Sequence, residues 1–311
     1  MQESDFVFGV FFLNQSVFGF LGNSIMFAMY LSIFISQPQK KKPTDLILTH
    51  LTVANTVTLL TRGIPETMAA FGMRDVLNDV GCRSVMYINR VSRGLSICTT
   101  CLLSVFQAVT ISPSTSRWAQ FKPRASNCIV PSFLFFWILN MLLYIRLITC
   151  SRAIGNVNIS GEVYVSKLCY TLPDGNVIHS VTFLLAITIR DLFFVLLTSW
   201  ASGYMVIVLS RHRRQVQHIH STRLSPKSSA EARATKTILL LVTCFACFYW
   251  LNTFITLSLV FAVEKDPQLE SVSVFLSGCF PALCPLLLIS KDLRMCHREA
   301  EKLLFSHRSC Q

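Results

Sequence analysis

The segment FVFGVFFLNQSVFGFLGNSIMFAMYLSIFI, residues 6–35, contains no Asp, Glu, Lys or Arg. A transmembrane helix needs about 20 consecutive apolar residues to cross a hydrocarbon core about 30 Å thick, and this segment exceeds that length. It follows the acidic Glu3 and Asp5 and precedes the basic run Lys40–Lys42. A cleaved signal peptide has a basic start and a shorter apolar region. The segment therefore predicts a signal anchor that remains as the first membrane helix.

Six further apolar segments follow the first. Of the 311 residues, 52% are hydrophobic and 14% are charged, whereas a soluble domain carries about 25% charged residues. The apolar segments are continuous and do not alternate over about ten residues, which excludes a transmembrane β-barrel. The sequence predicts an all-α membrane protein, a seven-transmembrane helical bundle in one domain, residues 1–311. The expected spans are residues 6–36, 45–71, 82–111, 128–150, 177–209, 236–263 and 271–290.

Basic residues are divided unevenly between the two ends of the expected bundle. Segments 36–44, 112–127, 210–236 and 291–311 share one end and hold 18 Lys and Arg residues. The loops at the other end hold 4, which are Arg74, Arg152, Lys167 and Lys265. Because Lys and Arg accumulate in cytoplasmic loops, we expect the N-terminus outside and the C-terminus in the cytoplasm. This bias accounts for most of the net charge of +12, so no nucleic-acid partner is expected.

Residues 291–311 are expected to form the cytoplasmic tail. Charged residues alternate there with Leu293, Met295, Leu303, Leu304 and Phe305. This pattern predicts a short amphipathic helix on the inner membrane surface. A frayed polar tail is the alternative.

Most of the twelve cysteines lie inside the expected spans, where two Cys-x-x-Cys pairs begin at Cys98 and Cys244. No His joins either pair at ligand spacing, so we expect no metal site. Three thiols are expected to reach the outer side, namely Cys82, Cys150 and Cys169. A disulfide between Cys82 and Cys169 would hold the second outer loop over the mouth of the bundle and contribute about 3–5 kcal/mol. Cys150 is the competing partner.

The same outer loop contains the glycosylation sequon Asn158-Ile159-Ser160. Asn14 also begins a sequon, but it lies inside the first expected span. The topology therefore favours Asn158 as the modified residue.

Ionisable residues inside a membrane span are costly and are candidates for function. The third span carries Arg90 and Arg93, and the fifth carries Arg190 and Asp191 at a comparable depth. One interpretation is that Asp191 neutralises an arginine of the third helix. The other is that these four residues line a pocket for a small polar or anionic ligand. The two interpretations are compatible.

A second pair of charges lies near the outer end of the second span. Arg62 and Glu66 are four residues apart and can pair on one helix face. No G-x-S-x-G, H-E-x-x-H or phosphate-binding loop occurs in the sequence. We therefore expect neither an enzyme nor a cofactor.

Several segments carry a family resemblance. The seven spans, the outer N-terminus, Gly22-Asn23 in the first span and residues 51–55 in the second resemble the G-protein-coupled receptor superfamily. More narrowly, the chain resembles the vomeronasal type 1 receptor family over nearly its full length. The segments that carry this resemblance are CLLSVFQAVTISP (101–113), SRWAQFK (116–122), LSRHRRQVQHIH (209–220), RATKTILLLV (233–242), CFYW (247–250) and CFPALCP (279–285).

The chain departs from the pattern of rhodopsin-like receptors. Residues 106–108 replace the acidic-Arg-aromatic trio at the end of the third helix, and Asn55 replaces the usual Asp of the second. The seventh span has Cys284-Pro285 where Asn-Pro is usual. These departures agree with the vomeronasal pattern. Bitter-taste receptors share some of them and are the closest alternative.

The resemblance implies a plasma-membrane receptor for a pheromone or a small odorant, coupled to a heterotrimeric G protein of the inhibitory class. The ligand would enter between the outer halves of the third, fifth, sixth and seventh helices, and the inner surface would bind the G protein. The basic residues proposed for that inner surface are Arg117, Lys122, Arg211, Arg213 and Arg214.

A small-solute transporter is the alternative from a different class of protein. A transporter needs a hydrophilic path across the bilayer, but the charges identified above lie in the outer half, and the inner halves of the spans are nearly uncharged. That distribution favours a blind pocket.

Overall fold

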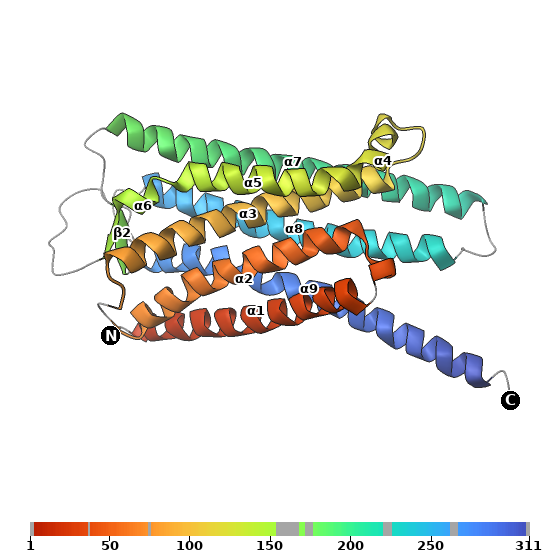
Figure 1. The fold of residues 1–311 in the computed structure, drawn as a ribbon, viewed down its shortest axis with the longest axis horizontal. Helices are drawn as coiled ribbons and strands as arrows, with labels where there is room; N and C mark the ends of the chain where they lie inside the picture. The colour runs from red at the N-terminus through yellow and green to blue at the C-terminus, as the bar shows by residue number, and fades with distance from the viewer. Residues whose placement is uncertain are drawn as a thin grey trace.

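The computed structural model describes residues 3–36, 38–73, 76–153, 168–171, 177–219, 226–261 and 267–308. Long helices run side by side along most of this part of the chain (Figure 1). They are α1 (Glu3–Ser36), α2 (Pro43–Ala70), α3 (Asp79–Ile111), α5 (Ile129–Tyr144), α7 (Val177–Ile219), α8 (Pro226–Phe261) and α9 (Pro267–Arg308). The shorter elements are η1 (Pro38–Lys40), η2 (Arg117–Phe121), α4 (Lys122–Ala125), η3 (Ser126–Cys128), α6 (Leu147–Cys150), β1 (Ser151–Ala153) and β2 (Cys169–Thr171).

Six helical stretches in the described residues are long and apolar enough to cross a membrane. The seventh long helix, α2, is more polar because it carries Asp45, Arg62, Glu66 and several threonines. The threonine hydroxyls bond within the helix; Thr52, for example, donates to the Leu48 carbonyl at 2.7 Å. Helix α2 packs against α1, α3 and α9, so its polar side chains lie among neighbouring helices.

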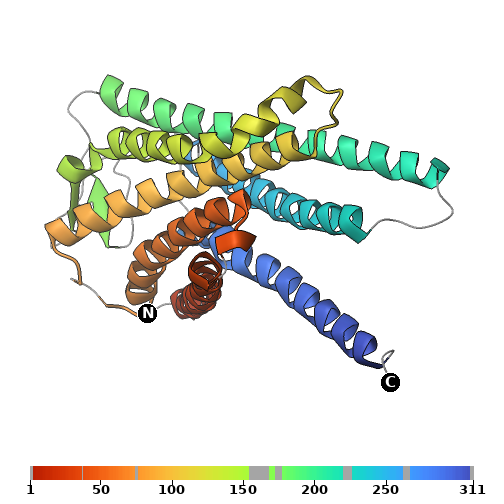
Figure 2. The same ribbon diagram turned by 45° about the vertical axis from the view of Figure 1, so that its right-hand side comes forward.

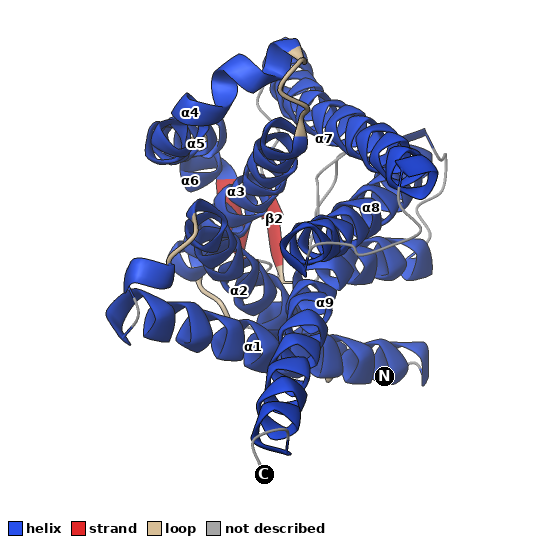
Figure 3. Ribbon diagram, turned by 90° about the vertical axis from the view of Figure 1, so that its right-hand side faces the viewer, coloured by secondary structure: helices blue, strands red, loops and turns tan. Residues whose placement is uncertain are grey.

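Helix α3 is the central element of the bundle. It packs against α2, α5, α7 and α8, and these helices surround it when the bundle is viewed along its length (Figure 3). Its side chains Leu95 and Leu103 are almost fully buried and belong to one apolar cluster with Leu51, Val195 and Leu241. Side chains on α3 are therefore placed to contact most of the other helices.

Proline and glycine determine how α1 packs on α9. Pro285 lacks an N–H group and so leaves the Pro281 carbonyl oxygen without its helical donor. The Asn23 side chain of α1 donates to that oxygen at 3.0 Å. A Cβ atom added to Gly22 would come within 2.9 Å of the Pro285 ring, so a side chain at position 22 would push the two helices apart.

Three helices extend many residues beyond the spans expected from the sequence. Helix α7 runs to Ile219, α8 begins at Pro226, and α9 continues to Arg308. The separate short helix expected after the last span is therefore part of α9, which projects away from the bundle (Figure 2). No Gly or Pro occurs between residues 286 and 308. The apolar character ends near residue 290, but nothing in the sequence ends the helix there.

Two short strands lie at one end of the bundle. Strands β1 and β2 pair antiparallel, with Arg152 opposite Tyr170 and Ala153 opposite Cys169. The N-terminus lies at this end and the C-terminus at the opposite end (Figure 1). We call the strand-bearing end the outer end, following the orientation expected from the basic loops.

Candidate functional site

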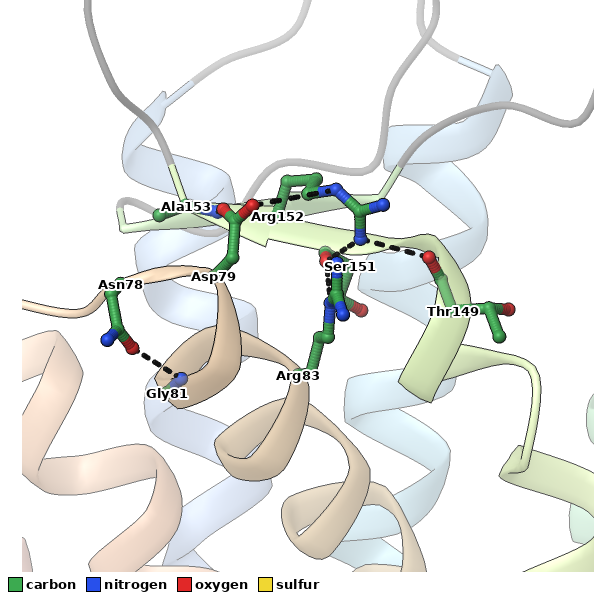
Figure 4. Close-up of polar contacts among 8 residues, drawn as sticks. All are labelled: Asn78, Asp79, Gly81, Arg83, Thr149, Ser151, Arg152 and Ala153. Atoms are coloured by element: carbon green, nitrogen blue, oxygen red, sulfur yellow. Dashed lines mark hydrogen bonds and ion pairs between the residues drawn. The ribbon is translucent and has the colours of Figure 1, made fainter.

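The two strands form a lid that is fixed to the start of α3 (Figure 4). The Asp79 carboxylate accepts a hydrogen bond of 2.9 Å from the Ala153 N–H and lies 3.6 Å from the Arg152 guanidinium. The Arg83 side chain donates to the Ser151 carbonyl oxygen at 3.3 Å. Two side chains of α3 that lie one helical turn apart, Asp79 and Arg83, therefore hold the lid.

A disulfide adds a covalent link between α3 and the lid. Cys82 is bonded to Cys169, and both residues are buried. Cys150 is a free, partly buried thiol. In this structure the disulfide partner of Cys82 is thus Cys169 and not Cys150. The sequon residue Asn158 lies outside the described residues.

A deep recess of about 400 Å³, part of it open to solvent, lies between α2, α3, α8 and α9. Aromatic side chains form much of its wall, and the rings of Phe245 and Phe280 meet edge to face at 4.9 Å. Polar groups lie beside them. The polar side chains that line the recess include Thr58, Arg93, Ser96, Tyr249 and Asn252. The site combines apolar surface with a few polar groups, as small-ligand sites do.

Arg93 is the cationic group among the residues that line the deep recess. The Asn252 amide hydrogen-bonds to two neighbours. Its oxygen accepts from Arg93 Nη2 at 3.0 Å, and its nitrogen donates to the Ser273 carbonyl oxygen at 2.8 Å. Asn252 is 6% exposed. This contact orients the Arg93 side chain toward α8 and the recess.

Arg190 is placed differently, since it lies in the wall between α3, α5 and α7. It is 8% exposed, and its guanidinium donates hydrogen bonds to the Asn140 amide oxygen and the Tyr144 hydroxyl of α5. Arg190 Nη2 also lies 2.7 Å from the Asp191 carboxylate. Both terminal nitrogens of the guanidinium therefore contact protein groups, whereas Arg190 Nε makes no hydrogen bond within the described part of the chain.

One sequence-based interpretation was wrong about the partner of Asp191. Asp191 pairs with its neighbour Arg190 on α7 and not with an arginine of α3. The reason is Gly94, because a Cβ atom there would overlap the Asn140 side chain and the Arg190 guanidinium. Without a side chain at position 94, the guanidinium lies between the helices and reaches the adjacent carboxylate. Tyr249 of α8, which lines the deep recess, lies near Asp191.

Arg90 lines a second, outer recess beneath the lid, between α2 and α3. This recess holds about 450 Å³ of space outside the protein atoms, part of it open solvent, and is also lined by Arg62, Glu66, Leu168 and Cys169. The four predicted pocket residues are thus divided. Arg93 lines the deep recess and Arg90 the outer one. Arg190 and Asp191 lie between α3, α5 and α7 and are not among the residues that line either recess.

Sequence reasoning missed Asn140, Tyr144 and Asn252. A lone amide inside an apolar span is a recognisable signal, because a polar group in hydrocarbon needs a partner. Asn140 is such a residue in α5, and it is fully buried. For Tyr144 no comparable signal exists, since tyrosine is common near the ends of membrane spans.

The inner end of the bundle carries exposed basic residues. Arg117, Lys122, Arg211 and Arg214 are exposed, whereas the side chain of Arg213 lies outside the described residues. Helix η2 packs on α7, with the rings of Trp118 and Trp200 5.5 Å apart. The structure therefore brings the basic residues of η2, α4 and α7 to one end.

Comparison with known proteins gives one family. The family model described as "Vomeronasal organ pheromone receptor family" matches residues 6–299. Human vomeronasal type-1 receptor 3 is 39% identical over 298 residues, which are 95% of this chain and 94% of that protein. Rat vomeronasal type-1 receptor 90 is 36% identical over 284 residues, 91% of this chain and 90% of that protein.

A fish protein is similar over a comparable share of the chain. Olfactory receptor class A-like protein 1 of Danio rerio is 34% identical over 288 residues, 92% of this chain and 90% of that protein. The family match over residues 6–299 includes the lid and the residues that line both recesses. The chain belongs to the vomeronasal type-1 receptor family and is a G-protein-coupled chemosensory receptor of the cell membrane, not an enzyme.

Proposed function

We propose that this pheromone receptor binds its small-molecule chemosignal in the deep recess. The observation that carries the proposal is the position of Arg93, whose cationic side chain shares one recess with Phe245, Phe248 and Phe280. A ligand that fits this site has an apolar body and an anionic or hydrogen-bond-accepting end. The aromatic wall would bury the body, and Arg93 would receive the polar end through a charge-assisted hydrogen bond.

Ligand binding at this place would link several helices. The deep recess is lined by side chains from α2, α3, α8 and α9. A ligand that contacts α8 better in one arrangement of the bundle than in another shifts the population toward the preferred arrangement. In our proposal that arrangement opens the inner end of the bundle to a heterotrimeric G protein of the inhibitory class.

The exposed basic residues at the inner end support the proposed G-protein contact. Arg117 and Lys122 come from the segment after α3, while Arg211 and Arg214 come from the inner end of α7. Arg213 is assigned to the same surface from the sequence. Such a surface would attract acidic groups of a partner protein.

The proposed orientation places the N-terminus and the lid outside the cell. It is supported by the Lys and Arg bias of the loops, and it puts Asn158 on the side where glycans are added. Tags at residue 2 and after Gln311 should label outside and inside intact cells, respectively. Asn158→Gln should remove a glycosidase-sensitive gel shift. A shift that disappears only in Asn14→Gln would reverse the assignment.

The ligand site is tested by calcium imaging in cells that express the receptor with a coupled G protein. Volatiles, neutral steroids and sulfated steroids form the panel. Phe248 lines the deep recess and is only partly buried, so Phe248→Ala should keep surface expression and weaken the response to every active compound. An unchanged response in Phe248→Ala would move the ligand out of the deep recess. Loss of the response after ADP-ribosylation of inhibitory α subunits would support the proposed G-protein class.

A further inference from the structure

One tyrosine hydroxyl joins α7 to the segment that follows α3 at the inner end of the bundle. The Tyr204 hydroxyl of α7 lies 3.0 Å from Ser112 Oγ and 3.4 Å from Ser116 Oγ. Ser112 is the C-cap of α3 and is 1% exposed. Ser116 is the N-cap of η2, and its Oγ accepts a hydrogen bond of 3.3 Å from the Trp118 N–H. Tyr204 therefore contacts both ends of residues 112–116, the turn between α3 and η2.

The direction of these hydrogen bonds follows from the single proton of the Ser112 hydroxyl. That hydroxyl donates to the Ala108 carbonyl oxygen at 2.8 Å, and a serine hydroxyl has one proton to donate. The Ser112 oxygen therefore accepts from Tyr204. Because the tyrosine proton is then used, the Ser116 hydroxyl donates to the Tyr204 oxygen. The result is one directed chain that runs from Ser116 through Tyr204 and Ser112 to the backbone of α3.

Aromatic rings place the same segment against α7. The Trp200 ring, one helical turn before Tyr204, stacks on the tyrosine ring with 6.2 Å between centroids. Trp118 of η2 lies 5.5 Å from Trp200. Ring contacts of this kind stabilise mainly by burying apolar area, and they do not need the hydroxyl group. The rings thus supply the apolar part of the contact, and the Tyr204 hydroxyl supplies its directional part.

The surroundings of Tyr204 include a third helix. Ala108, Ala201 and Met205 are buried in one apolar cluster between α3 and α7. Tyr204 and Leu239 of α8 pack against this cluster. Helix α8 also lines the deep recess. A rearrangement of α8 would therefore reach the surroundings of Tyr204 through direct packing.

The segment that Tyr204 holds leads into the basic residues proposed to contact the G protein. Arg117 follows Ser116 directly, and Lys122 follows the end of η2; both are exposed. A surface that is already ordered loses less conformational entropy when a partner binds. Fixing residues 112–116 on α7 fixes the backbone from which Arg117 extends.

We infer that Tyr204 is a positioning residue for G-protein coupling. Its hydroxyl holds residues 112–116 on α7 so that Arg117 is presented to the G protein. The inference rests on the proposed inner surface and deepens it, because it assigns the order of that surface to one hydroxyl group of α7. Tyr204 is not among the described residues that line the deep recess, so loss of the hydroxyl should weaken coupling without changing the ligand site.

The first measurement tests the order of the segment. Tyr204→Phe removes the hydroxyl and keeps the ring that stacks on Trp200. Backbone hydrogen–deuterium exchange of residues 113–121 in the purified full-length receptor, held in lipid nanodiscs, should be about two- to tenfold faster in this variant. Tyr87→Phe is the matched control, because it removes a hydroxyl that donates to the Met141 carbonyl oxygen at 3.2 Å in the outer half of the bundle. Unchanged exchange in Tyr204→Phe would overturn the inference.

The second measurement tests coupling and needs no chemosignal. It is the apparent Kd of the receptor for nucleotide-free heterotrimers, one for each class of α subunit. For the heterotrimer that wild type binds most tightly, Tyr204→Phe should raise the Kd about two- to tenfold, and Tyr87→Phe should leave it unchanged. Ser112→Ala removes the acceptor of the tyrosine proton and serves as the second variant if Tyr204→Phe expresses poorly. It should also raise the Kd, and the two effects should be less than additive. An unchanged or lower Kd in Tyr204→Phe would overturn the inference.

A double variant separates this inference from the proposed inner surface. In the Arg117→Gln background, Tyr204→Phe should raise the Kd less than it does in wild type, because the cation that Tyr204 positions is gone. An equal effect of Tyr204→Phe in both backgrounds would overturn the positioning role alone. An unchanged Kd in Arg117→Gln by itself would overturn the contact proposed for Arg117, and this inference with it.

Discussion

The Asn23 side chain of α1 donates a 3.0 Å hydrogen bond to the Pro281 carbonyl oxygen of α9. This oxygen lacks its helical donor because Pro285 has no N–H group. Within a membrane no water can replace that donor, so the partner must come from another helix. This hydrogen bond explains why Gly22-Asn23 of α1 packs directly against the segment 279–285 of α9. Glycine permits the close approach, and asparagine satisfies the oxygen that proline leaves free.

Asn23→Ala should destabilise the receptor by about 1–3 kcal/mol, because it leaves the Pro281 oxygen buried and unpaired. Pro285→Ala restores an N–H group at the required position. The double variant Asn23→Ala/Pro285→Ala should therefore recover part of the loss, with a coupling free energy of about 0.5–3 kcal/mol. Thermal unfolding of the four proteins measures this cycle. Additive effects would show that the two residues act independently.

Gly94→Ala should reduce the amount of folded receptor at the cell surface. The new methyl group would overlap the Asn140 side chain and the Arg190 guanidinium, and overpacking of this kind costs about 1–3 kcal/mol. Gly203→Ala is the matched control, since an added Cβ at position 203 has no atom within 4 Å. Surface labelling should be low for the first variant and normal for the second. Normal labelling of both would contradict the close packing at Gly94.

Asp191→Asn should destabilise the receptor by about 3–5 kcal/mol, because the buried guanidinium of Arg190 would lose its counter-charge. Changing Arg190 to Gln as well removes the unpaired charge, so Arg190→Gln/Asp191→Asn should express better than Asp191→Asn alone. Arg93→Gln should give no such rescue, since the ion pair of Asp191 is with Arg190. Rescue by Arg93→Gln and not by Arg190→Gln would show that Asp191 pairs with Arg93 of α3 instead of Arg190.

Cys82→Ser and Cys169→Ser should each impair surface expression, and the double variant should be no worse than either single one. Both single variants break the same disulfide, which closes a long loop and contributes about 3–5 kcal/mol in the chain-entropy model. Cys150→Ser is the control, because Cys150 is a free thiol. A defect in Cys150→Ser together with normal expression of Cys169→Ser would contradict the observed pairing.

The sequence predicts the long helices well, because a membrane helix must be apolar over a fixed length and must bond its backbone internally. The helix ends were harder to predict. Hydropathy indicates where the membrane ends, but α7, α8 and α9 continue as polar helices. The family match confirms the vomeronasal resemblance and decides against the bitter-taste and transporter alternatives.

The candidate site was predicted only in part. The sequence identifies which charges lie at a similar depth, but their partners depend on how helices rotate and how closely they pack. Gly94 allows Arg190 to enter the wall and bind Asn140, and no spacing rule indicates this. The division of Arg90 and Arg93 between two recesses likewise depends on the bonds of Asn89 to α2.

The most direct test of the proposed ligand site compares dose-response curves for a sulfated ligand and its neutral analogue. Wild type, Arg93→Gln and the control Arg146→Gln should be matched for surface expression. Losing a charge-assisted hydrogen bond should raise the half-maximal concentration of the sulfated ligand about tenfold or more in Arg93→Gln. The neutral analogue and the control variant should show little change. An unchanged curve for the sulfated ligand in Arg93→Gln would contradict the assignment of the deep recess.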